Sequence, residues 1–303
     1  MIYSHFDEIL LINYKKWSKS RFIGRTAQYF YAKVFGNITI KDDIGIKQID
    51  GHSIYFDPKD KFLHNQLKFY QLTEKFLTKL IKKNVTKDMT TINIGANVGY
   101  YTLLLARQVG KGGIVYSFEP FLSTIKFLKK TVKESGYNNI EIIPKAVRNK
   151  TGIEKMALLE SSMHNIFVPN HPDWHKIKVD VISLDDFLTD KNSKIDFILM
   201  DAEGSEPYIL DGMKKTIENN PNLEIITEYN AFTLNTSGTN LEDFYNKIQG
   251  YGFNVFNIDE LTHKVVPITK DELLVRYPNK VHETNVTNLY LTKNSNKNFD
   301  DFL

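Results

Sequence analysis

The sequence predicts an α/β fold with a doubly wound parallel sheet, and three observations support this prediction. Residues 89–94 form a short apolar run that ends in Gly95-Ala96-Asn97-Val98-Gly99, and an apolar helical pattern follows at once. From Met89 onward, strand-like and helix-like segments alternate, which is typical of a parallel sheet covered by helices on both faces. Three of the predicted strands end in a carboxylate, so acidic side chains should meet at one edge of the sheet.

The glycine turn is typical of the strand–turn–helix entry of a nucleotide-binding βαβ unit. Gly95 and Gly99 allow a sharp turn and a close approach of the backbone to a ligand, because neither carries a Cβ. A helix that begins near Val98 would direct its free N–H groups and its positive dipole end toward that ligand. The sequence contains neither the dinucleotide glycine pattern nor the phosphate-loop pattern, so a diphosphate ligand is not expected.

Glu119 is the candidate for binding ribose hydroxyl groups. It ends the apolar run from Ile114, and it follows Gly95 by close to the ~20 residues that separate such a carboxylate from the turn. A ribose-binding acid without a diphosphate site fits an adenosine ligand that lacks phosphates. S-adenosyl-L-methionine is the common ligand of this kind.

Composition limits the classes of protein to which this chain can belong. The 303 residues allow one large domain, or one domain with a smaller attachment. Hydrophobic residues at 42% and charged residues at 25% are ordinary for a globular protein, and a net charge of +3 is too mild to indicate a nucleic-acid partner. The absence of cysteine excludes disulfides, cysteine zinc sites and thiol nucleophiles. No apolar run approaches the ~20 residues that span a bilayer, so we expect a cytoplasmic protein without a transmembrane segment.

The first 85 residues are predicted to form an N-terminal cap of helices and a β-hairpin. Residues 1–35 carry aromatic and basic side chains at helical spacing, which favours amphipathic helices packed on the main domain. The alternative is a lid or a surface for a lipid-linked or anionic substrate. Alternating runs around Asp50-Gly51 predict a hairpin over residues 38–57, and one-sided apolar periodicity predicts a helix over residues 63–83.

Residues 86–294 are predicted to form the main domain, and residues 295–303 a polar, frayed tail. The elements expected after the first helix are, in chain order, a strand over 114–119, a helix over 121–135, strands over 140–144, 153–159 and 177–182, a helix over 184–188 capped by Ser183, a strand over 195–201, a helix capped by Ser205, a strand over 223–228, a helix over 241–249, and strands over 253–258 and 288–291.

Four acids are expected beside the glycine turn. Glu119, Asp201 and Glu228 end predicted strands, and Glu203 lies just beyond the second of these ends. Ligands of open α/β sheets bind outside the carboxyl ends of the strands. A single acid at a strand end is usually a solvated turn residue, but four acids together with a glycine turn indicate a site.

The motifs together identify a resemblance to a known family. They are the run from Ile92 to Ala106, and then Phe118-Glu119-Pro120, Lys145-Ala146-Val147, Ser183-Leu184-Asp185 and Asp201-Ala202-Glu203-Gly204-Ser205-Glu206. In this order, over roughly residues 85–260, the chain resembles the FkbM family of S-adenosylmethionine-dependent methyltransferases. The resemblance implies the class I methyltransferase (Rossmann-like) fold, with a seven-stranded sheet whose last strand is antiparallel. It also implies methyl transfer to a hydroxyl group of a sugar, a polyketide or another small metabolite.

The resemblance also implies roles for single residues in binding S-adenosyl-L-methionine. Gly95, Ala96, Asn97 and Gly99 would surround the methionine part, Glu119 followed by Pro120 would bind the ribose, and Lys145 with Ala146 would lie at the adenine edge. The family usually has Asp two residues before the first glycine, where this chain has Asn93. A neutral amide still forms hydrogen bonds but offers no charge, so weaker cofactor binding or loss of activity is one hypothesis.

A hydroxyl acceptor needs a base, and the acids after the fourth strand are the first candidates. Asp201 and Glu203 rank first, ahead of Glu228, and Asp201 also counts as a cofactor-binding candidate. The alternative is that Glu203 and Glu206 cap the following helix. A divalent ion held by Asp201, Glu203 and Glu228 is a further alternative, although no metal is expected. The histidines of the loop over residues 161–176, His164, His171 and His175, are more typical of a loop than of a base or a zinc site.

The resulting prediction is an S-adenosyl-L-methionine-dependent O-methyltransferase that acts on a small-molecule or glycan acceptor, without a nucleic-acid partner. Two alternatives stay open. One is an RNA methyltransferase, and the other is a catalytically silent binding protein of the same fold, for which Asn93 is the argument.

Overall fold

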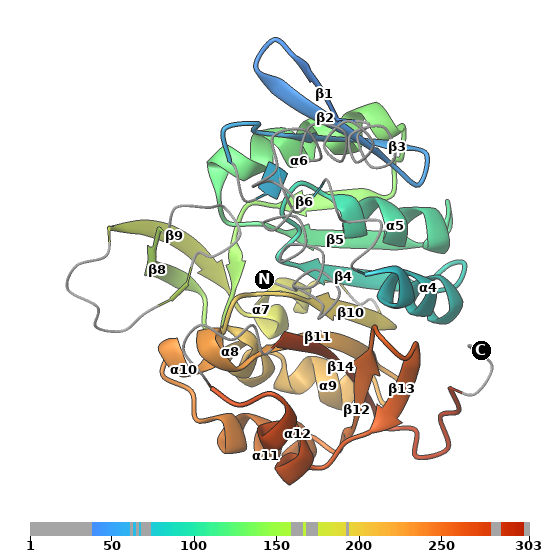
Figure 1. The fold of residues 1–303 in the computed structure, drawn as a ribbon, viewed down its shortest axis with the longest axis vertical. Helices are drawn as coiled ribbons and strands as arrows, with labels where there is room; N and C mark the ends of the chain where they lie inside the picture. The colour runs from blue at the N-terminus through green and yellow to red at the C-terminus, as the bar shows by residue number, and fades with distance from the viewer. Residues whose placement is uncertain are drawn as a thin grey trace, which may run out of the picture.

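The computed structural model describes residues 38–60, 63–64, 67, 74–158, 166–167, 175–191, 194–279 and 286–299. Within these residues the central feature is an eight-stranded sheet (Figure 1). Its strands, from one edge to the other, are β6 (Ile140–Ile143), β5 (Ile114–Phe118), β4 (Thr90–Ile94), β10 (Phe197–Met200), β11 (Glu224–Asn230), β14 (Val286–Thr292), β12 (Asn254–Asp259) and β13 (Lys264–Pro267).

The strand directions confirm the predicted doubly wound sheet with an antiparallel last strand. The neighbours β6, β5, β4, β10 and β11 pair in parallel. The last strand, β14, inserts between β11 and β12 and runs antiparallel to both. The strand β13 adds an eighth, antiparallel edge to the predicted seven. It was not predicted, because four residues that include a lysine and a proline give no periodic signal.

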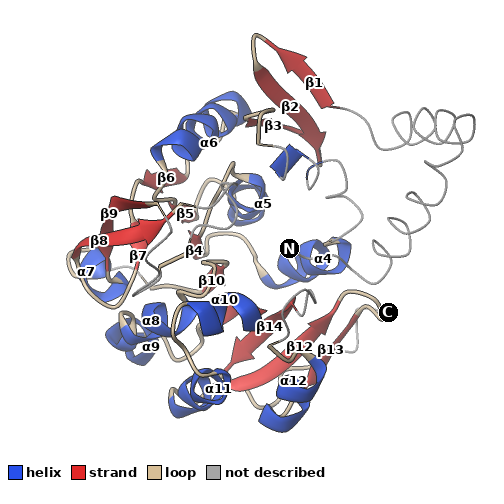
Figure 2. Cartoon of the chain, turned by 60° about the vertical axis from the view of Figure 1, so that its left-hand side comes forward, coloured by secondary structure: helices blue, strands red, loops and turns tan. Residues whose placement is uncertain are grey.

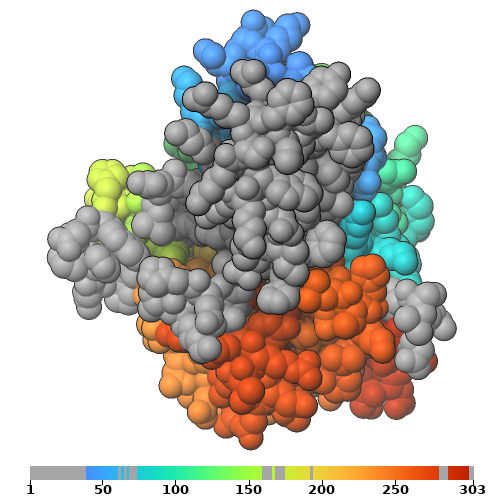
Figure 3. Space-filling view, viewed as in Figure 1, coloured from blue at the N-terminus to red at the C-terminus, as the bar shows by residue number. Residues whose placement is uncertain are grey.

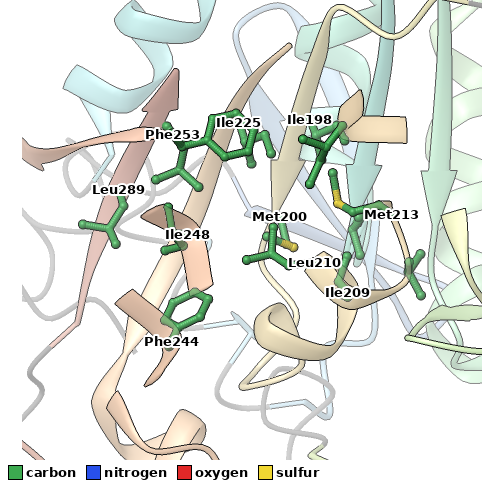
Figure 4. Packing of buried hydrophobic residues seen from close by; sticks show 14 of the residues in the cluster. Ile198, Met200, Ile209, Leu210, Met213, Ile225, Phe244, Ile248, Phe253 and Leu289 are labelled. Atoms are coloured by element: carbon green, nitrogen blue, oxygen red, sulfur yellow. The ribbon is translucent and has the colours of Figure 1, made fainter. Parts of the chain in front are cut away.

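Both faces of the sheet are buried, as the alternation of strands and helices predicts. Alternate residues along a strand point to opposite faces, so Ile198 and Met200 of β10 join one core whereas Phe197 and Leu199 join the other. The first core is covered by α8 (Glu206–Asp211), α9 (Lys214–Asn219) and α11 (Leu241–Gly250), and Figure 4 shows it from close by. The second core is covered by α4 (Lys75–Asn84) and α5 (Tyr100–Val109), on the other side of the strands in Figure 2.

The predicted hairpin is present and packs on the helix α6 (Leu122–Ser135). The hairpin consists of β2 (Ile44–Ile49) and β3 (His52–Phe56), which pair antiparallel, and a further strand, β1 (Ile38–Lys41), pairs antiparallel with β2 to make a three-stranded sheet. Asp50 and Gly51, at φ 50° and 83°, form its tight turn. Ile54 and Phe56 join a buried cluster with Phe127 of α6, so the hairpin shares a core with the main domain. In Figure 3 the hairpin and the C-terminal elements lie at opposite ends of the face in view.

A second sheet lies beside the carboxyl ends of the main strands. It consists of β7 (Ala146–Val147), β9 (Lys176–Ile182) and β8 (Gly152–Ala157), in this order. The strands predicted over 153–159 and 177–182 are therefore confirmed, but their pairing apart from the main sheet was not predicted. The helix α7 (Leu184–Leu188) follows, and the Ser183 hydroxyl accepts a hydrogen bond from the Asp186 N–H at 3.1 Å as its predicted cap.

Several boundaries differ from the predictions. The helix expected near Val98 begins at Tyr100, with Gly99 as its N-cap residue in the left-handed conformation. The Ser205 side chain does not cap α8, and β11 continues past Glu228 to Asn230. The helices α9, α10 (Ala231–Thr236) and α12 (Lys270–Arg276) were not predicted, because six or seven residues show barely two helical turns.

The C-terminal tail is not frayed where the structure describes it. Lys297 forms an ion pair with Glu224 at 2.5 Å, and the Phe299 ring lies 5.1 Å from that of Phe256 and 5.0 Å from that of Tyr290. The predicted helices of residues 1–35, the middle of the helix expected over 63–83, and the residues His164 and His171 lie outside the described residues. None of the described helices has the length and apolar character that crossing a membrane requires.

Glu260, which follows β12, fixes the N-terminus of α4. Its carboxylate accepts hydrogen bonds from the N–H groups of Phe76 and Leu77 at 3.0 and 2.7 Å, and these are two of the N–H groups that a helix cannot satisfy by itself. Glu260→Ala should lower the free energy of unfolding by about 1–3 kcal/mol, because both donors lose a charged acceptor. The matched control is Glu134→Ala on the exposed face of α6, with an expected change of less than about 0.5 kcal/mol. Urea denaturation of both variants measures the difference, and equal stabilities would contradict the assigned role.

Candidate active site

A pocket opens at the carboxyl ends of the parallel strands, where the sequence analysis expected the site. Most of the predicted residues line it, and they come from the segments after β4, β5, β6 and β10: Gly95, Asn97, Glu119, Pro120, Lys145, Ala146, Asp201 and Glu203. Glu228 joins them through its contact with the acids after β10. Ala96, Gly99 and Asn93 do not line the pocket.

The two glycines of the turn serve the packing of the chain itself. A Cβ on Gly95 would lie 1.8 Å from the carbonyl oxygen of Asp201, so the ends of β4 and β10 approach too closely for any other residue. A Cβ on Gly99 would lie 2.7 Å from Cδ1 of Leu128, so this glycine lets α5 pack against α6. Both have positive φ, at 82° and 99°, a conformation that favours glycine. Their positive φ values confirm the sharp turn expected from the sequence, and the close approach of a ligand to this backbone stays a prediction.

Glu119 is held rigidly at the floor of the pocket. Its side chain is only 5% exposed, and its two oxygens accept hydrogen bonds from the N–H groups of Asn97 and Phe121, both at 3.0 Å. Burial raises the pKa of Glu119 to about 7, and the two backbone hydrogen bonds oppose this rise. Each carboxylate oxygen can accept more than one hydrogen bond, so both retain capacity for a ligand hydroxyl group.

Asn97 contributes a second polar group beside Glu119. Its backbone is left-handed, at φ 46°, a conformation that asparagine tolerates better than most residues. Its side-chain oxygen Oδ1 is buried and has no hydrogen-bond partner among the described residues. A buried acceptor without a partner is costly, and this arrangement fits a ligand that donates a hydrogen bond there.

Asn93 points away from the pocket. It is 2% exposed, and its amide donates a hydrogen bond to the Thr102 hydroxyl of α5 at 2.9 Å. The Thr102 hydroxyl in turn lies 3.0 Å from that of Ser117 in β5. The amide therefore belongs to a buried polar chain that joins β4, β5 and α5, and a neutral donor is suited to this place.

The second sheet supplies an apolar wall of the pocket that sequence reasoning missed. Met156 and Phe167 line the pocket together with Ala146, and all three belong to one buried cluster. The guanidinium group of Arg148 lies 4.4 Å from the ring centre of Phe167 and 4.1 Å from that of Tyr208, which fixes this wall against α8. The local sequence pattern does not predict these contacts, because they depend on the pairing of β7, β8 and β9.

Three acids form a cluster on the other side of the pocket. Carboxylate oxygens of Asp201, Glu203 and Glu228 lie within 4.8 Å of one another. Asp201 is exposed and Glu203 is half-buried, whereas Glu228 is only 5% exposed. Burial raises the pKa of Glu203 to about 8, with the charges of Asp201 and Glu206 adding to the rise, and burial with the charge of Asp201 raises the pKa of Glu228 well above its usual value. The cluster is therefore poised to bind a proton or a cation.

Glu203 and Glu206, whose roles the sequence left open, have different contacts. The Oε1 atom of Glu206 accepts a hydrogen bond from the Ala202 N–H at 2.8 Å, so this acid secures the turn before α8. Glu203 has its Oε2 atom buried without a partner among the described residues, and its backbone is left-handed at φ 49°. Such a conformation costs a residue other than glycine about 1–3 kcal/mol, and here it holds the carboxylate at the pocket.

The sequence profile of the methyltransferase FkbM domain matches residues 93–255, which is more than half of the 303 residues. The chain belongs to the FkbM methyltransferase family. The predicted family and the predicted class I methyltransferase fold are therefore confirmed, and S-adenosyl-L-methionine is the cofactor that goes with them. The residues that line the pocket lie inside the matched residues. So do four of the five motifs quoted for the resemblance, and the fifth, from Ile92 to Ala106, begins one residue before the match.

The individual proteins similar to this FkbM-family chain share either a short segment with it or a low sequence identity. It is 36% identical over 52 residues to a protein-L-isoaspartate O-methyltransferase of Methanosarcina mazei, a match that covers 17% of this chain and 21% of that protein. It is also similar to the structure of an rRNA methylase from Clostridium thermocellum, with 12% identity, a TM-score of 0.42, and coverage of 71% of this chain and 92% of that one. A methyltransferase from Streptococcus mutans in complex with SAH has 10% identity and a TM-score of 0.44, covering 72% and 96%.

Replacing Gly95 by alanine should damage both the fold and the site. The control is Gly136→Ala at the end of α6, where φ is also positive, at 73°, but the added Cβ meets nothing within 4 Å. The control should lose about 1–2 kcal/mol of unfolding free energy, the cost of a left-handed conformation. Gly95→Ala should lose clearly more, because the Asp201 carbonyl must also move. Chemical denaturation compares the two, and equal losses would show that the approach of β4 to β10 tolerates a side chain.

Proposed function

We propose that this FkbM-family chain transfers the methyl group of S-adenosyl-L-methionine to a hydroxyl oxygen of a sugar, a glycan or another small-molecule acceptor. The observation that carries the proposal is that one pocket combines a backbone-anchored carboxylate, Glu119, with a separate cluster of acids. The first suits the cofactor's ribose, and the second suits the proton of an acceptor.

The residues around Glu119 fit an adenosyl ligand. Glu119, with Pro120, would accept hydrogen bonds from the ribose hydroxyl groups, and Lys145 and Ala146 would lie at the adenine edge beside the apolar wall of Met156 and Phe167. Gly95 and Asn97, which line the pocket, would border the methionine part, with the unpartnered Oδ1 atom of Asn97 available to its amino group. Ala96 and Gly99 would act on the methionine part only by shaping the turn after β4. Asp201 borders the same space. When bound, the cofactor supplies an electrophilic methyl group, and the protein supplies position and field.

The acid cluster would act on the acceptor. A hydroxyl oxygen must lose its proton to become an ether oxygen, and a carboxylate within hydrogen-bond reach can take it. Glu203 is our first candidate for this base. Burial raises its pKa to about 8, so its deprotonated form is a stronger base than an ordinary carboxylate, and its Oε2 atom has no partner in the described chain. Asp201 and Glu228 would orient the acceptor's hydroxyl group beside this base.

The position of Asn93 supports an active enzyme over a silent binding protein. Its amide is satisfied by Thr102 and does not line the pocket. The loss of a charge at this position therefore has no direct path to the cofactor's reactive centre.

We also propose that residues 1–85 cap the main domain at residues 86–294. The hairpin packs on α6, and α4 covers the sheet together with α5. These contacts favour an attachment that folds with the main domain over an independent unit.

Glu119→Gln should weaken the binding of S-adenosyl-L-methionine by about 1–3 kcal/mol, the cost of losing a charged acceptor. Because the pKa of Glu119 is raised to about 7, the wild-type affinity should increase as the pH rises through 7 and the carboxylate becomes charged. The variant should lack this step. Calorimetric titration between pH 6 and 8 measures both effects, with Glu134→Gln on α6 as a control. The proposed cofactor site would be contradicted if the wild type does not bind S-adenosyl-L-methionine at millimolar concentration. It would also be contradicted if Glu119→Gln binds the cofactor with the affinity of the wild type.

Glu203→Gln should keep the fold and the cofactor affinity but lower kcat by about 10²–10⁴-fold, because the base is removed. Glu206→Ala should have the opposite profile, with about 1–3 kcal/mol less unfolding free energy and little change in kcat for the folded fraction, since the Ala202 N–H loses its acceptor. The assay offers methyl-labelled cofactor to a panel of sugars, small hydroxyl metabolites and RNA. Transfer to RNA alone would contradict the proposed acceptor, and full activity of Glu203→Gln and Asp201→Asn alike would contradict the proposed base.

A further inference from the structure

We infer that Asp201, Glu203 and Glu228 bind one hard divalent cation of the Mg²⁺, Mn²⁺ or Ca²⁺ type at the acceptor side of the pocket. The inference deepens the proposed function, because such a cation would hold the acceptor's oxygen. Binding of the cation itself does not depend on that function.

The three side chains converge from two neighbouring strands. Asp201 and Glu203 follow β10, and Glu228 lies within β11, which pairs with β10 in parallel. Each side chain offers one carboxylate oxygen, and these three oxygens lie within 4.8 Å of one another. Glu228 is therefore placed by a strand, Asp201 by its position directly after β10 with its N–H bonded to the Ile94 carbonyl, and Glu203 by the turn that follows.

Glu228 provides an independent reason to expect a ligand. It is 5% exposed, yet its Oε2 atom has no hydrogen-bond partner in the part of the chain that the structure describes, and the same holds for Oε2 of Glu203. Buried carboxylates are normally paired or coordinate a metal. Among the described residues, no Lys, Arg or His forms an ion pair with any of the three acids. Arg148, for example, pairs with Glu154.

The ligand set selects the class of cation. Three carboxylate oxygens are hard ligands, which suit Mg²⁺, Mn²⁺ and Ca²⁺, whereas zinc favours nitrogen and sulfur and the chain has no cysteine. Oxygens on opposite sides of one ion are about 5 Å apart for Ca²⁺ and about 4 Å apart for Mg²⁺, and neighbouring oxygens lie closer together. The three carboxylate oxygens, within 4.8 Å of one another, would therefore draw together around the ion. Three protein ligands leave about three positions of a six-coordinate ion for water and for oxygens of the acceptor.

Manganese binding to the full-length protein tests the inference directly. The protein is treated with EDTA, freed of it, and titrated with Mn²⁺ while electron paramagnetic resonance records the free ion. We expect one saturable site per chain, from which Mg²⁺ or Ca²⁺ displaces Mn²⁺. Glu228→Gln and Asp201→Asn should each weaken Mn²⁺ binding by at least about tenfold. Glu141→Gln, an acid on β6 that is 47% exposed and paired with Lys191, should leave it unchanged. Thermal unfolding without cation verifies that each variant is folded.

The outcomes separate this inference from the proposed function. Absence of saturable Mn²⁺ binding up to millimolar concentration, or binding that Glu228→Gln and Asp201→Asn leave unchanged, would overturn the cation site. If S-adenosyl-L-methionine still binds in EDTA, the proposed cofactor site stands although the cation site has failed. Conversely, Mn²⁺ binding that requires Glu228 supports the inference even in a protein that transfers no methyl group.

Discussion

The contact between Gly95 and the carbonyl group of Asp201 is the constraint on which the site depends. Because residue 95 has no Cβ, the ends of β4 and β10 lie side by side, and the Asp201 N–H donates a hydrogen bond to the Ile94 carbonyl at 3.0 Å. This approach brings the turn after β4, which carries Asn97, next to the acids after β10. A side chain at residue 95 would separate the two halves of the pocket, the one proposed for the adenosyl group and the one proposed for the acceptor.

The buried carboxylates of the two halves of the pocket differ in their hydrogen bonding. Glu119 is buried but fully engaged, since each of its oxygens accepts a backbone N–H, so it joins the turn after β4 to the start of α6 even without a ligand. In the acid cluster, Glu203 and Glu228 each keep a buried oxygen without a partner in the described chain. Buried acceptors of this kind cost stability. The proposed proton acceptor and cation ligands would account for that cost at Glu203 and Glu228. Glu206 also keeps a buried Oε2 atom without a partner in the described chain, but its Oε1 atom accepts a hydrogen bond from the Ala202 N–H and so supports the turn.

The sequence alone determined the fold class, the order of the main strands and the edge at which the acids meet. These follow from local signals: the apolar runs, the glycine turn before α5, and the rule that ligands bind at the carboxyl ends of parallel strands. Glu119, Asp201 and Glu203 could be placed together for this reason, and all three lie within residues 93–255, which the family profile matches.

Only the tertiary structure decided what depends on pairing and on the direction of side chains. It directs the Asn93 amide to Thr102, and it forms a separate sheet, so that Met156 and the neighbouring Phe167 line the pocket. It also gives the hydrogen bond from the Ala202 N–H to Glu206. Residues far apart in sequence make these contacts, and a one-residue change of register would reverse the face to which a strand residue points. The sequence shows which residues could form such contacts, but burial and strand register decide which of these residues lie next to each other.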